Sequence, residues 1–580
     1  MKNLWKYLRD YKKESVIAPL FKMLEAAFDL LVPLVMASII NQGITGGDQT
    51  YILHRCLILV LLGVIGLACS ITAQYFAAKA AVGFGANLRH ALFAHVQTLG
   101  FSEMDTIGTS TLITRMTSDI NQVQSGLNLF LRLFLRSPFI VFGSVVMAFT
   151  VNVKAALVFV VTIPVLSIAV FGIMLLTMPL YRKVQGSLDK VLGITRENLT
   201  GVRVVRAFAR EEDELERFET ANGVLLKGQL AVGKISALMN PLTYVIVNLG
   251  IVAILRTGAV QIQTGGMQQG DVVALVNYMG QVLIELVKLA NLIIQVTKAL
   301  ACAERVSAVL AVEPKMKFKE INERADKKSD AEITEMISFD HVSFTYEGAG
   351  GEALSNIHFT AKKGQTVGII GGTGSGKSTL VQLIPRFYDA SGGRIFLEGR
   401  NIREYSKETL RKKIGVVMQK AQLFSGTIRS NLLWGNENAS DEKLWAALET
   451  AQAADFVRAK ELGLDAPVEQ GGRNLSGGQK QRLTIARALV AEPEVLILDD
   501  SASALDFATD AALRRAIREL DENMTVFIVS QRAASIRHAD LILVLDDGVT
   551  VGMGTHEELL ANCEVYREIY ESQFRKAGES

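Results

Sequence analysis

Eight residues from Gly371 to Ser378, GGTGSGKS, combine glycines, a lysine and a hydroxyl side chain at a spacing suited to holding phosphate groups. The run follows the strand-like QTVGII and precedes the helix-like TLVQLIPRF. In that context glycines let consecutive backbone amides point at phosphate oxygens, next to the positive end of a helix. The sequence therefore predicts a phosphate loop for a nucleoside triphosphate. Its expected contacts are Gly371, Gly372, Thr373, Gly374, Ser375, Gly376, Lys377, Ser378 and Thr379.

Two side chains of this loop and one acid farther along the chain complete the predicted chemistry. Lys377 would reach the β and γ phosphates, and the Ser378 hydroxyl would ligate Mg²⁺. The run VLILDD, from Val495 to Asp500, has the pattern of a buried strand that ends in two acids beside a phosphate site. We expect Asp499 to hold the magnesium through water.

The segment LSGGQKQR, from Leu475 to Arg482, carries a resemblance to a known family. LSGGQ is similar to the signature of ATP-binding cassette (ABC) proteins. Ser476, Gly477 and Gly478 open a predicted helix, where a hydroxyl and backbone amides can meet a γ phosphate bound on a facing subunit. The resemblance therefore implies a dimer of cassettes, with ATP and Mg²⁺ as ligands. The residues expected to act on the partner's ATP are Leu475, Ser476, Gly477, Gly478 and Gln479.

Other positions match the family residue by residue. Tyr346 in VSFTY resembles the aromatic side chain that stacks on adenine, and Gln419 in VVMQ resembles the glutamine that touches magnesium and senses the membrane domain. SALD, from Ser503 to Asp506, resembles the loop that crosses the dimer interface. QGGRN, from Gln470 to Asn474, resembles the segment that contacts cytosolic helices. The resemblance implies a metal set of Ser378, Gln419 and Asp499.

Two catalytic positions depart from the family pattern. Active cassettes carry Glu after the magnesium-binding Asp, but this chain has Asp500. Because aspartate is one methylene shorter, its carboxylate lies about an ångström short of the position from which a general base would act on the attacking water. A general base contributes about 10²–10⁴-fold to the rate. Gln531 in FIVSQRAAS stands where the family places a histidine, and glutamine carries no charge near neutral pH.

These two changes resemble the degenerate-site half of heterodimeric bacterial exporters. The resemblance implies a partner that is a different half-transporter chain, with Glu and His at the positions of Asp500 and Gln531. The intact LSGGQ of this chain would then complete the partner's hydrolysing site. A tolerated variant in an active homodimer is the alternative.

The first half of the chain predicts the membrane part. Of the 580 residues 49% are hydrophobic, the mean hydropathy is +0.27, and the apolar excess lies before residue 300. About 20 apolar residues cross the hydrocarbon of a bilayer, and six stretches qualify. The expected fold is an all-α six-helix exporter bundle followed by an α/β nucleotide-binding domain with a phosphate loop. The predicted spans are Val16–Ile40, Ile52–Ala78, Leu129–Val151, Ala155–Leu180, Ala237–Val260 and Val272–Ile294.

The long loops between the spans carry most of the Lys and Arg residues, which places them, the N-terminus and the cassette in the cytosol. MKNLWKYLRDYKKE at the N-terminus is typical of an interfacial helix. The family layout implies coupling helices near Thr106–Ile113 and Val202–Arg210, in a multi-pass protein of a bacterial cytoplasmic membrane. The predicted domains are an elbow helix at 1–15, a transmembrane domain at 16–310, a linker at 311–336 and a cassette at 337–572.

Seven charged residues fall inside predicted spans. Unpaired charge there is costly, so such residues either face a partner or a water-filled cavity in a transport pathway, or form ion pairs. The charged residues would also be explained if the spans begin farther along the chain than the predicted ranges. Three of the seven share one face of the first span. The seven are Lys22, Glu25, Asp29, Arg132, Arg136, Glu285 and Lys288.

The expected function is ATP-driven export of a small amphipathic or hydrophobic compound by one half of a two-chain transporter in a lipid membrane. A regulatory sensor or gated pore is the alternative from another class. The net charge of +2 does not indicate nucleic acid as a partner. Six spans exclude a soluble cassette ATPase of the DNA-repair kind, and the fusion of spans to a cassette disfavours an importer. Four scattered cysteines predict no disulfide.

Overall fold

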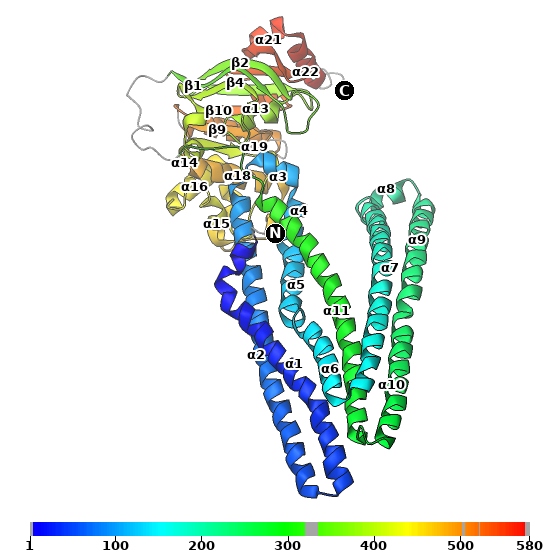
Figure 1. The fold of residues 1–580 in the computed structure, drawn as a ribbon. Helices are drawn as coiled ribbons and strands as arrows, with labels where there is room; N and C mark the ends of the chain where they lie inside the picture. The colour runs from blue at the N-terminus through cyan, green and yellow to red at the C-terminus, as the bar shows by residue number, and fades with distance from the viewer. Residues whose placement is uncertain (1–3, 320–333, 502–504, 521, 575–580) are drawn as a thin grey trace. The chain divides into compact units, whose positions relative to one another are not determined.

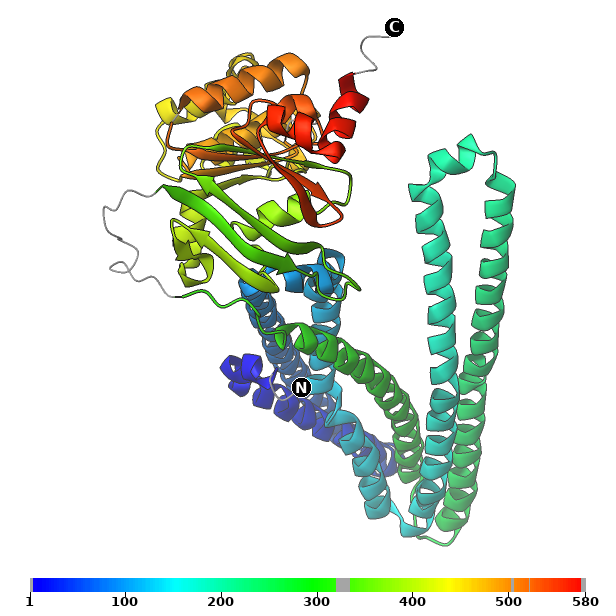
Figure 2. The same cartoon turned by 90° about the horizontal axis from the view of Figure 1, so that it is seen from above.

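The computed structural model describes residues 4–319, 334–501, 505–520 and 522–574 (Figures 1 and 2). The chain forms two compact units. The first takes residues 1–97 and 109–312, and the second takes residues 98–108 and 313–580. The short segment 98–108 therefore belongs to the second unit, although long helices of the first unit flank it in sequence.

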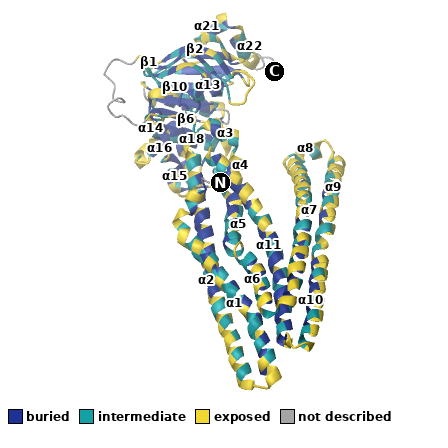
Figure 3. Ribbon diagram, viewed as in Figure 1, coloured by how far each residue is buried: buried dark blue, intermediate teal, exposed yellow. Residues whose placement is uncertain are grey.

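The first unit contains six helices long and apolar enough to cross a membrane. Small residues of α2, among them Ala73, Ala77 and Ala80, are buried, and many of its large apolar side chains are exposed (Figure 3). This is the arrangement expected where small residues let helices approach and large ones face lipid. The elements are η1 (Trp5–Tyr11), α1 (Lys12–Ser38), η2 (Ile39–Ile44), α2 (Gln49–Thr98), α4 (Thr109–Thr114), η3 (Arg115–Asp119), α5 (Ile120–Leu133), α6 (Arg136–Val151), α7 (Val153–Thr200), α8 (Val202–Ala207), α9 (Glu211–Ala237), α10 (Met239–Gln263) and α11 (Gln269–Leu310).

The third predicted span, Leu129–Val151, is not one continuous helix. It is divided into α5 and α6 by a turn at residues 134–135. Pro138 explains the break, because a proline ring clashes with the carbonyl four residues earlier, here that of Phe134. Three other predicted spans lie within helices that continue beyond them, α2 to Thr98, α7 to Thr200 and α11 to Leu310. The first span, Val16–Ile40, runs two residues past α1 into η2, and the fifth, Ala237–Val260, crosses the junction of α9 and α10.

No continuous helix covers Thr106–Ile113, the range predicted for the first coupling helix. The structure has α3 at Phe101–Ile107, and the helix ends at Gly108, whose φ of 79° is readily adopted only by glycine. A helix over Thr106–Ile113 would have to pass through this residue. The second one, α8, ends at Ala207 rather than at Arg210, and Ala209 has a φ of 51°.

The helix α3 packs inside the second unit. The ring of Phe101 stacks on Phe387 with 4.6 Å between centroids, and the Tyr388 hydroxyl donates a hydrogen bond of 2.6 Å to Asp105. Burial and this hydrogen bond to Asp105 raise the pKa of Tyr388 well above its usual range. A segment inserted between two membrane helices thus contributes to the fold of the second unit.

The second unit is built on a six-stranded sheet in the order β12-β11-β3-β10-β9-β6 and a four-stranded sheet in the order β2-β1-β4-β5. The strands are β1 (Glu335–Phe344), β2 (Leu354–Lys362), β3 (Thr366–Gly371), β4 (Gly392–Leu397), β5 (Arg400–Asn401), β6 (Ile414–Val417), β7 (Gly426–Thr427), β8 (Pro467–Val468), β9 (Val495–Asp499), β10 (Thr525–Val529), β11 (Leu541–Asp546) and β12 (Val549–Gly554). The helices are α13 (Lys377–Leu383), η4 (Ile402–Glu404), α14 (Lys407–Lys413), α15 (Ile428–Leu432), α16 (Asp441–Thr450), α17 (Ala454–Arg458), η5 (Gly463–Asp465), η6 (Gln470–Gly472), α18 (Gly477–Val490), α19 (Phe507–Leu520), α20 (Ala533–Ile536), α21 (His556–Asn562) and α22 (Glu564–Phe574).

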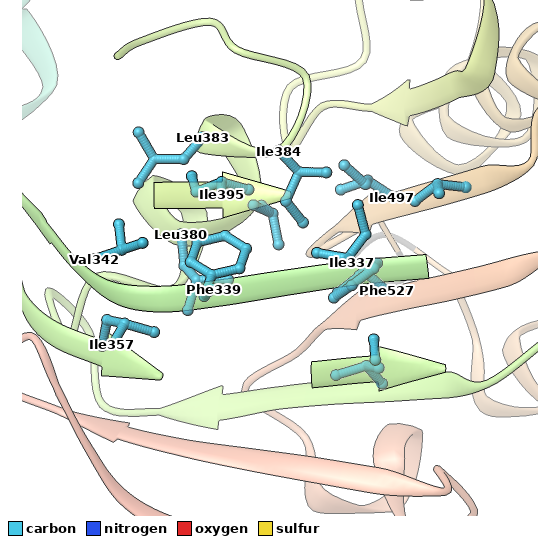
Figure 4. Packing of buried hydrophobic residues seen from close by; sticks show 14 of the residues in the cluster. Ile337, Phe339, Val342, Ile357, Leu380, Leu383, Ile384, Ile395, Ile497 and Phe527 are labelled. Atoms are coloured by element: carbon cyan, nitrogen blue, oxygen red, sulfur yellow. The ribbon is translucent and has the colours of Figure 1, made fainter. Parts of the chain in front are cut away.

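An apolar core holds α13 against these sheets (Figure 4). Phe339 of β1, Phe527 of β10 and Leu380 of α13 are fully buried in one cluster. The helix that follows the predicted phosphate loop therefore rests on a packed interior, which fixes the loop in place. The prediction of a six-helix membrane bundle ahead of an α/β nucleotide-binding domain is confirmed.

Most of the seven charged residues inside the predicted spans form one ion-pair network. Arg136 of α6 lies 2.6 Å from Glu285 of α11 and 2.9 Å from Asp29 of α1. Lys22 lies 2.6 Å from Glu25, and Lys288 lies 2.9 Å from Glu285. Six of the seven residues therefore form ion pairs, and Arg132 is not in these pairs.

Candidate nucleotide site

The sheet of the second unit brings the predicted site residues to one edge. Strands β3, β10, β9 and β6 are parallel, so their carboxyl ends meet. The phosphate loop follows β3, Asp499 ends β9, Gln419 comes after β6, and Gln531 comes after β10. Ligands of open α/β sheets bind in the crevice at the carboxyl ends of the strands.

The predicted phosphate loop has a backbone that requires glycine. Gly376 has a φ of 90°, and a Cβ atom built on it would lie 2.8 Å from the carbonyl oxygen of Ala353. The next residue, Lys377, begins α13, so the loop ends at the positive end of a helix dipole. This geometry leaves backbone amides at the position where a phosphate chain would bind.

The side chain of Lys377 lies against the backbone of its own loop. Its Nζ donates hydrogen bonds of 3.0 Å to the Gly371 carbonyl and 3.2 Å to Ser375 Oγ. Burial lowers the pKa of Lys377, against the opposing effect of Asp500 and Asp499. When a phosphate binds, the Lys377 amine would exchange these neutral hydrogen-bond acceptors for a charged one, which forms a stronger hydrogen bond.

The pair Ser378 and Asp499 has the chemistry of a magnesium site. Ser378 Oγ donates a hydrogen bond of 2.8 Å to Asp499 Oδ1, and Asp499 is 3% exposed. Burial raises the pKa of Asp499, and the hydrogen bond from Ser378 only partly offsets this effect. Together with Gln419, these side chains line one cavity and offer hard oxygen donors of the kind Mg²⁺ prefers.

Replacing Asp499 by asparagine should stabilise the nucleotide-free cassette at neutral pH. Because its folded-state pKa is raised, stability is lost as pH rises from the unfolded value, about 3.9, through the folded one. Asparagine removes this cost and can still accept the hydrogen bond from Ser378. We expect the melting temperature at pH 7 to rise by about 2–4 °C, the effect of ~1 kcal/mol in a domain of this size, and the gain to shrink toward pH 4. A lower melting temperature at pH 7 would contradict this.

The adjoining pocket of about 300 Å³ collects most of the predicted ATP contacts. The Tyr346 hydroxyl lies 3.0 Å from Thr379 Oγ1 at this pocket. Ala353, Val529 and Ser530 also line it, and sequence reasoning missed them; only the position of Ser530 next to Gln531 gave any signal. The predicted residues that line it are Tyr346, Thr373, Gly374, Gly376, Lys377, Ser378, Thr379, Gln419, Asp500 and Gln531.

The remaining predicted contacts lie beside this pocket rather than in its lining. Gly371 ends β3 and Asp499 ends β9, and both are buried behind it. Gly372 accepts a hydrogen bond from Lys377 through its carbonyl, and Ser375 does so through its hydroxyl. Gly372 and Ser375 therefore hold the Lys377 side chain within the loop.

The two residues that depart from the family pattern, Asp500 and Gln531, both line the pocket. Asp500 has a φ of 45°, and its backbone N–H donates to the Val529 carbonyl at 3.1 Å. Its Oδ2 accepts a hydrogen bond of 3.4 Å from Gln419 Nε2. The shortened carboxylate is thus directed at the neighbouring glutamine within the site.

The predicted signature forms the start of α18. Ser476 caps this helix, accepting from the Gln479 N–H at 3.3 Å, while Gln479 Oε1 accepts from the Ser476 N–H at 3.0 Å. Leu475 is buried, whereas Ser476 and Gly477 are exposed. Within the described chain, the pocket lining includes none of Leu475, Ser476, Gly477, Gly478 and Gln479.

Of the other two segments matched to the family, SALD is partly outside the described residues and QGGRN is fully described. Ser503 of SALD lies outside the described residues, while Asp506 accepts a hydrogen bond of 2.8 Å from the Thr509 N–H. In QGGRN, Gln470–Gly472 forms η6, and Asn474 donates to the Pro467 carbonyl at 2.8 Å. These contacts fix the backbone shortly before the signature helix.

The chain is similar to known proteins along its whole length. Residues 15–286 match the family model "ABC transporter transmembrane region", and residues 354–503 match the model "ABC transporter". An uncharacterised ABC transporter ATP-binding protein of Bacillus subtilis, YfiB, is 37% identical over 100% of this chain and 99% of its own. The ATP-dependent lipid A-core flippase of Salmonella typhimurium is 30% identical over 99% of this chain and 97% of its own.

A solved structure shares the fold. The structure of a bacterial Atm1-family ABC exporter with ATP bound superimposes with a TM-score of 0.78 and 24% identity. The match covers 98% of this chain and 99% of that chain. Six membrane helices and one cassette are therefore an exporter-type fold.

Proposed function

Since this chain belongs to the ABC transporter family and joins the membrane and ATPase parts of an exporter half-transporter, we propose that it is the degenerate-site subunit of a heterodimeric exporter. Its cassette is an ATPase whose hydrolysis drives export, and a half-transporter requires a second half. We assign the assembly to the cytoplasmic membrane of a bacterium, because the matched relatives are bacterial.

One observation carries the degenerate-site proposal. Asp500 follows β9 and Gln531 follows β10, yet both residues line the same pocket. One shortens the group that would polarise the attacking water, and the other removes a side chain that could carry charge beside the γ phosphate. Two losses in one site would slow hydrolysis without weakening ATP binding, because the phosphate loop is intact.

The proposed roles of the other residues follow from their places in the pocket. Tyr346 would stack on adenine, and Lys377 with the loop amides would bind the β and γ phosphates. Ser378, Gln419 and Asp499 would hold Mg²⁺, which neutralises phosphate charge when it is bound. ATP held here would join this cassette to the signature of the partner while the partner's own site hydrolyses.

Exposed apolar surface supports a partner of the same architecture. At the tip of the α7–α9 hairpin, Leu199, Val204 and Phe208 are 72%, 60% and 73% exposed. On the cassette, Phe424 and Trp434 stack at 4.3 Å and are exposed as well. Apolar patches of this kind mark contact surfaces. We propose that the hairpin tip docks on the partner's cassette and transmits its closure to the membrane helices.

The proposed cargo is a small amphipathic or hydrophobic compound. The membrane helices are largely apolar, and six of the seven charged residues inside the predicted spans are paired, so the unit offers little to a strongly charged solute. A relative that covers the full length is named as a lipid flippase, which agrees with such a cargo. Apolar substrates enter such sites mainly through contact area rather than charge.

The test of the heterodimer is identification of the partner. The chain, tagged and expressed at its natural level, should co-purify with a second ABC half-transporter in equal amount. Sequencing that chain should find Glu and His at the positions that match Asp500 and Gln531. Recovery of a stable, active assembly that contains only this chain would contradict the proposal.

A further inference from the structure

An apolar groove of about 160 Å³ lies in the first unit, where the N-terminal segment crosses three long helices. Leu4 and Leu8 enter it from the N-terminal segment, and they are 5% and 8% exposed. Phe84 of α2, Leu127 of α5 and Val296 of α11 form the facing walls. No charged side chain is among the described residues that line it, so its occupant must be apolar.

The groove lies at the depth of the predicted cytosolic boundary of the membrane. Phe84 follows the end of the second predicted span at Ala78, and Val296 follows the end of the sixth at Ile294. Leu127 precedes the start of the third predicted span at Leu129. An apolar hollow at this level is open to the acyl chains and headgroups of the cytosolic leaflet.

The N-terminal segment supplies positive charge beside the groove. While Leu4 and Leu8 point inward, Lys6 and Arg9 are exposed. The two acids of the same segment have other partners: Asp10 accepts a hydrogen bond from Asn87, and Glu14 pairs with Lys79. Exposed basic residues close to the cytosolic leaflet attract anionic lipids, and basic pockets between membrane helices hold their headgroups.

We propose that this groove binds a short segment of one acyl chain of an anionic phospholipid from the cytosolic leaflet, with its headgroup held by Lys6 and Arg9. The bound segment fills the space between η1, α5 and α11 and fastens the N-terminal segment to the bundle. This site is separate from the nucleotide pocket, and it does not depend on the heterodimer.

The experiment measures lipid retained by the purified full-length chain. The protein is reconstituted with equal amounts of phosphatidylglycerol and phosphatidylcholine of identical acyl chains, washed in detergent and examined by native mass spectrometry. The wild type should retain about one phosphatidylglycerol per chain. Val296→Trp, which fills the groove, should retain at least fivefold less. The matched control Ile293→Trp, at an exposed position of the same helix outside the groove, should retain as much as the wild type.

A second pair of variants tests the headgroup. Lys6→Glu with Arg9→Glu should lose the preference for phosphatidylglycerol over phosphatidylcholine, since each basic residue near the membrane surface contributes about fivefold. Lys234→Glu, an exposed charge on α9, should keep that preference. Leu127→Trp fills the groove from α5 and replaces Val296→Trp if thermal unfolding shows that variant to be misfolded.

Three results would overturn the inference. One is equal phosphatidylglycerol retention by the Val296→Trp and Ile293→Trp chains. Another is a wild type that retains both lipids equally. The third is a crosslink from a photoreactive residue at position 296 to a partner polypeptide instead of to lipid, which would make the groove a subunit interface.

Discussion

Replacing Lys377 by alanine should weaken ATP binding to this chain's own pocket by about 30-fold or more. The Nζ of Lys377 lies within the phosphate loop, hydrogen-bonded only to neutral oxygens of Gly371, Gly372 and Ser375. A buried charge pair between this amine and a phosphate contributes about 2–5 kcal/mol, and each 1.4 kcal/mol is a factor of ten in affinity. Titration of the purified chain with a fluorescent ATP analogue measures the change.

The control for that experiment is Lys420→Ala. Lys420 is an exposed lysine next to Gln419, so its removal changes the charge near the site by the same amount. We expect its ATP affinity to stay within about twofold of the wild type, because exposed charges are screened by solvent. If both variants bound ATP like the wild type, the loop would not be the nucleotide site.

Arg136→Ala should lower the free energy of unfolding of the membrane unit by about 3–5 kcal/mol, the usual cost of removing one partner of a buried ion pair. Arg136 joins α6 to Glu285 on α11 and to Asp29 on α1. Glu285 is 3% exposed and also accepts a hydrogen bond of 2.7 Å from Ser137, so its charge cannot reach water when Arg136 is removed. Thermal unfolding in detergent, followed by the near-ultraviolet signal, measures the loss.

Lys288→Met provides the comparison, because it removes another partner of the same carboxylate. The Lys288 side chain is 43% exposed, so it contributes less than about 1 kcal/mol. Arg136→Lys should recover only part of the stability, since an ammonium group cannot span both carboxylates as the planar guanidinium does. Equal destabilisation by Arg136→Ala and Lys288→Met would show that burial does not govern this network.

The parts of the fold that could be predicted from the sequence are those encoded by residues close together in the chain. Six apolar runs and the phosphate loop are local patterns, and the structure has the helices and the loop where these patterns lie. The break in the third span could not be read from Pro138 alone, because Pro19 and Pro33 lie inside α1 and Pro164 and Pro179 lie inside α7. Gly108 gave a local signal for the end of α3.

Contacts between distant residues could not be predicted in the same way. Arg136 and Glu285 are 149 residues apart, and Tyr388 and Asp105 are 283 residues apart. A single sequence shows that a charge in a span needs a partner, but the packing of α1, α6 and α11 decides which one. Likewise, Asp500 and Gln531 meet in one pocket only because β9 and β10 are neighbours in the sheet.

The most direct test of the degenerate site is ATP hydrolysis by the purified chain, alone and with its partner, comparing the wild type with Asp500→Glu and Asp500→Asn. We expect little turnover by the chain alone. With the partner we expect turnover that survives Asp500→Asn, and a higher rate for Asp500→Glu because the longer side chain brings the carboxylate back to the attacking water. Brisk hydrolysis by the chain alone that Asp500→Asn abolishes would show an active homodimer and contradict the account.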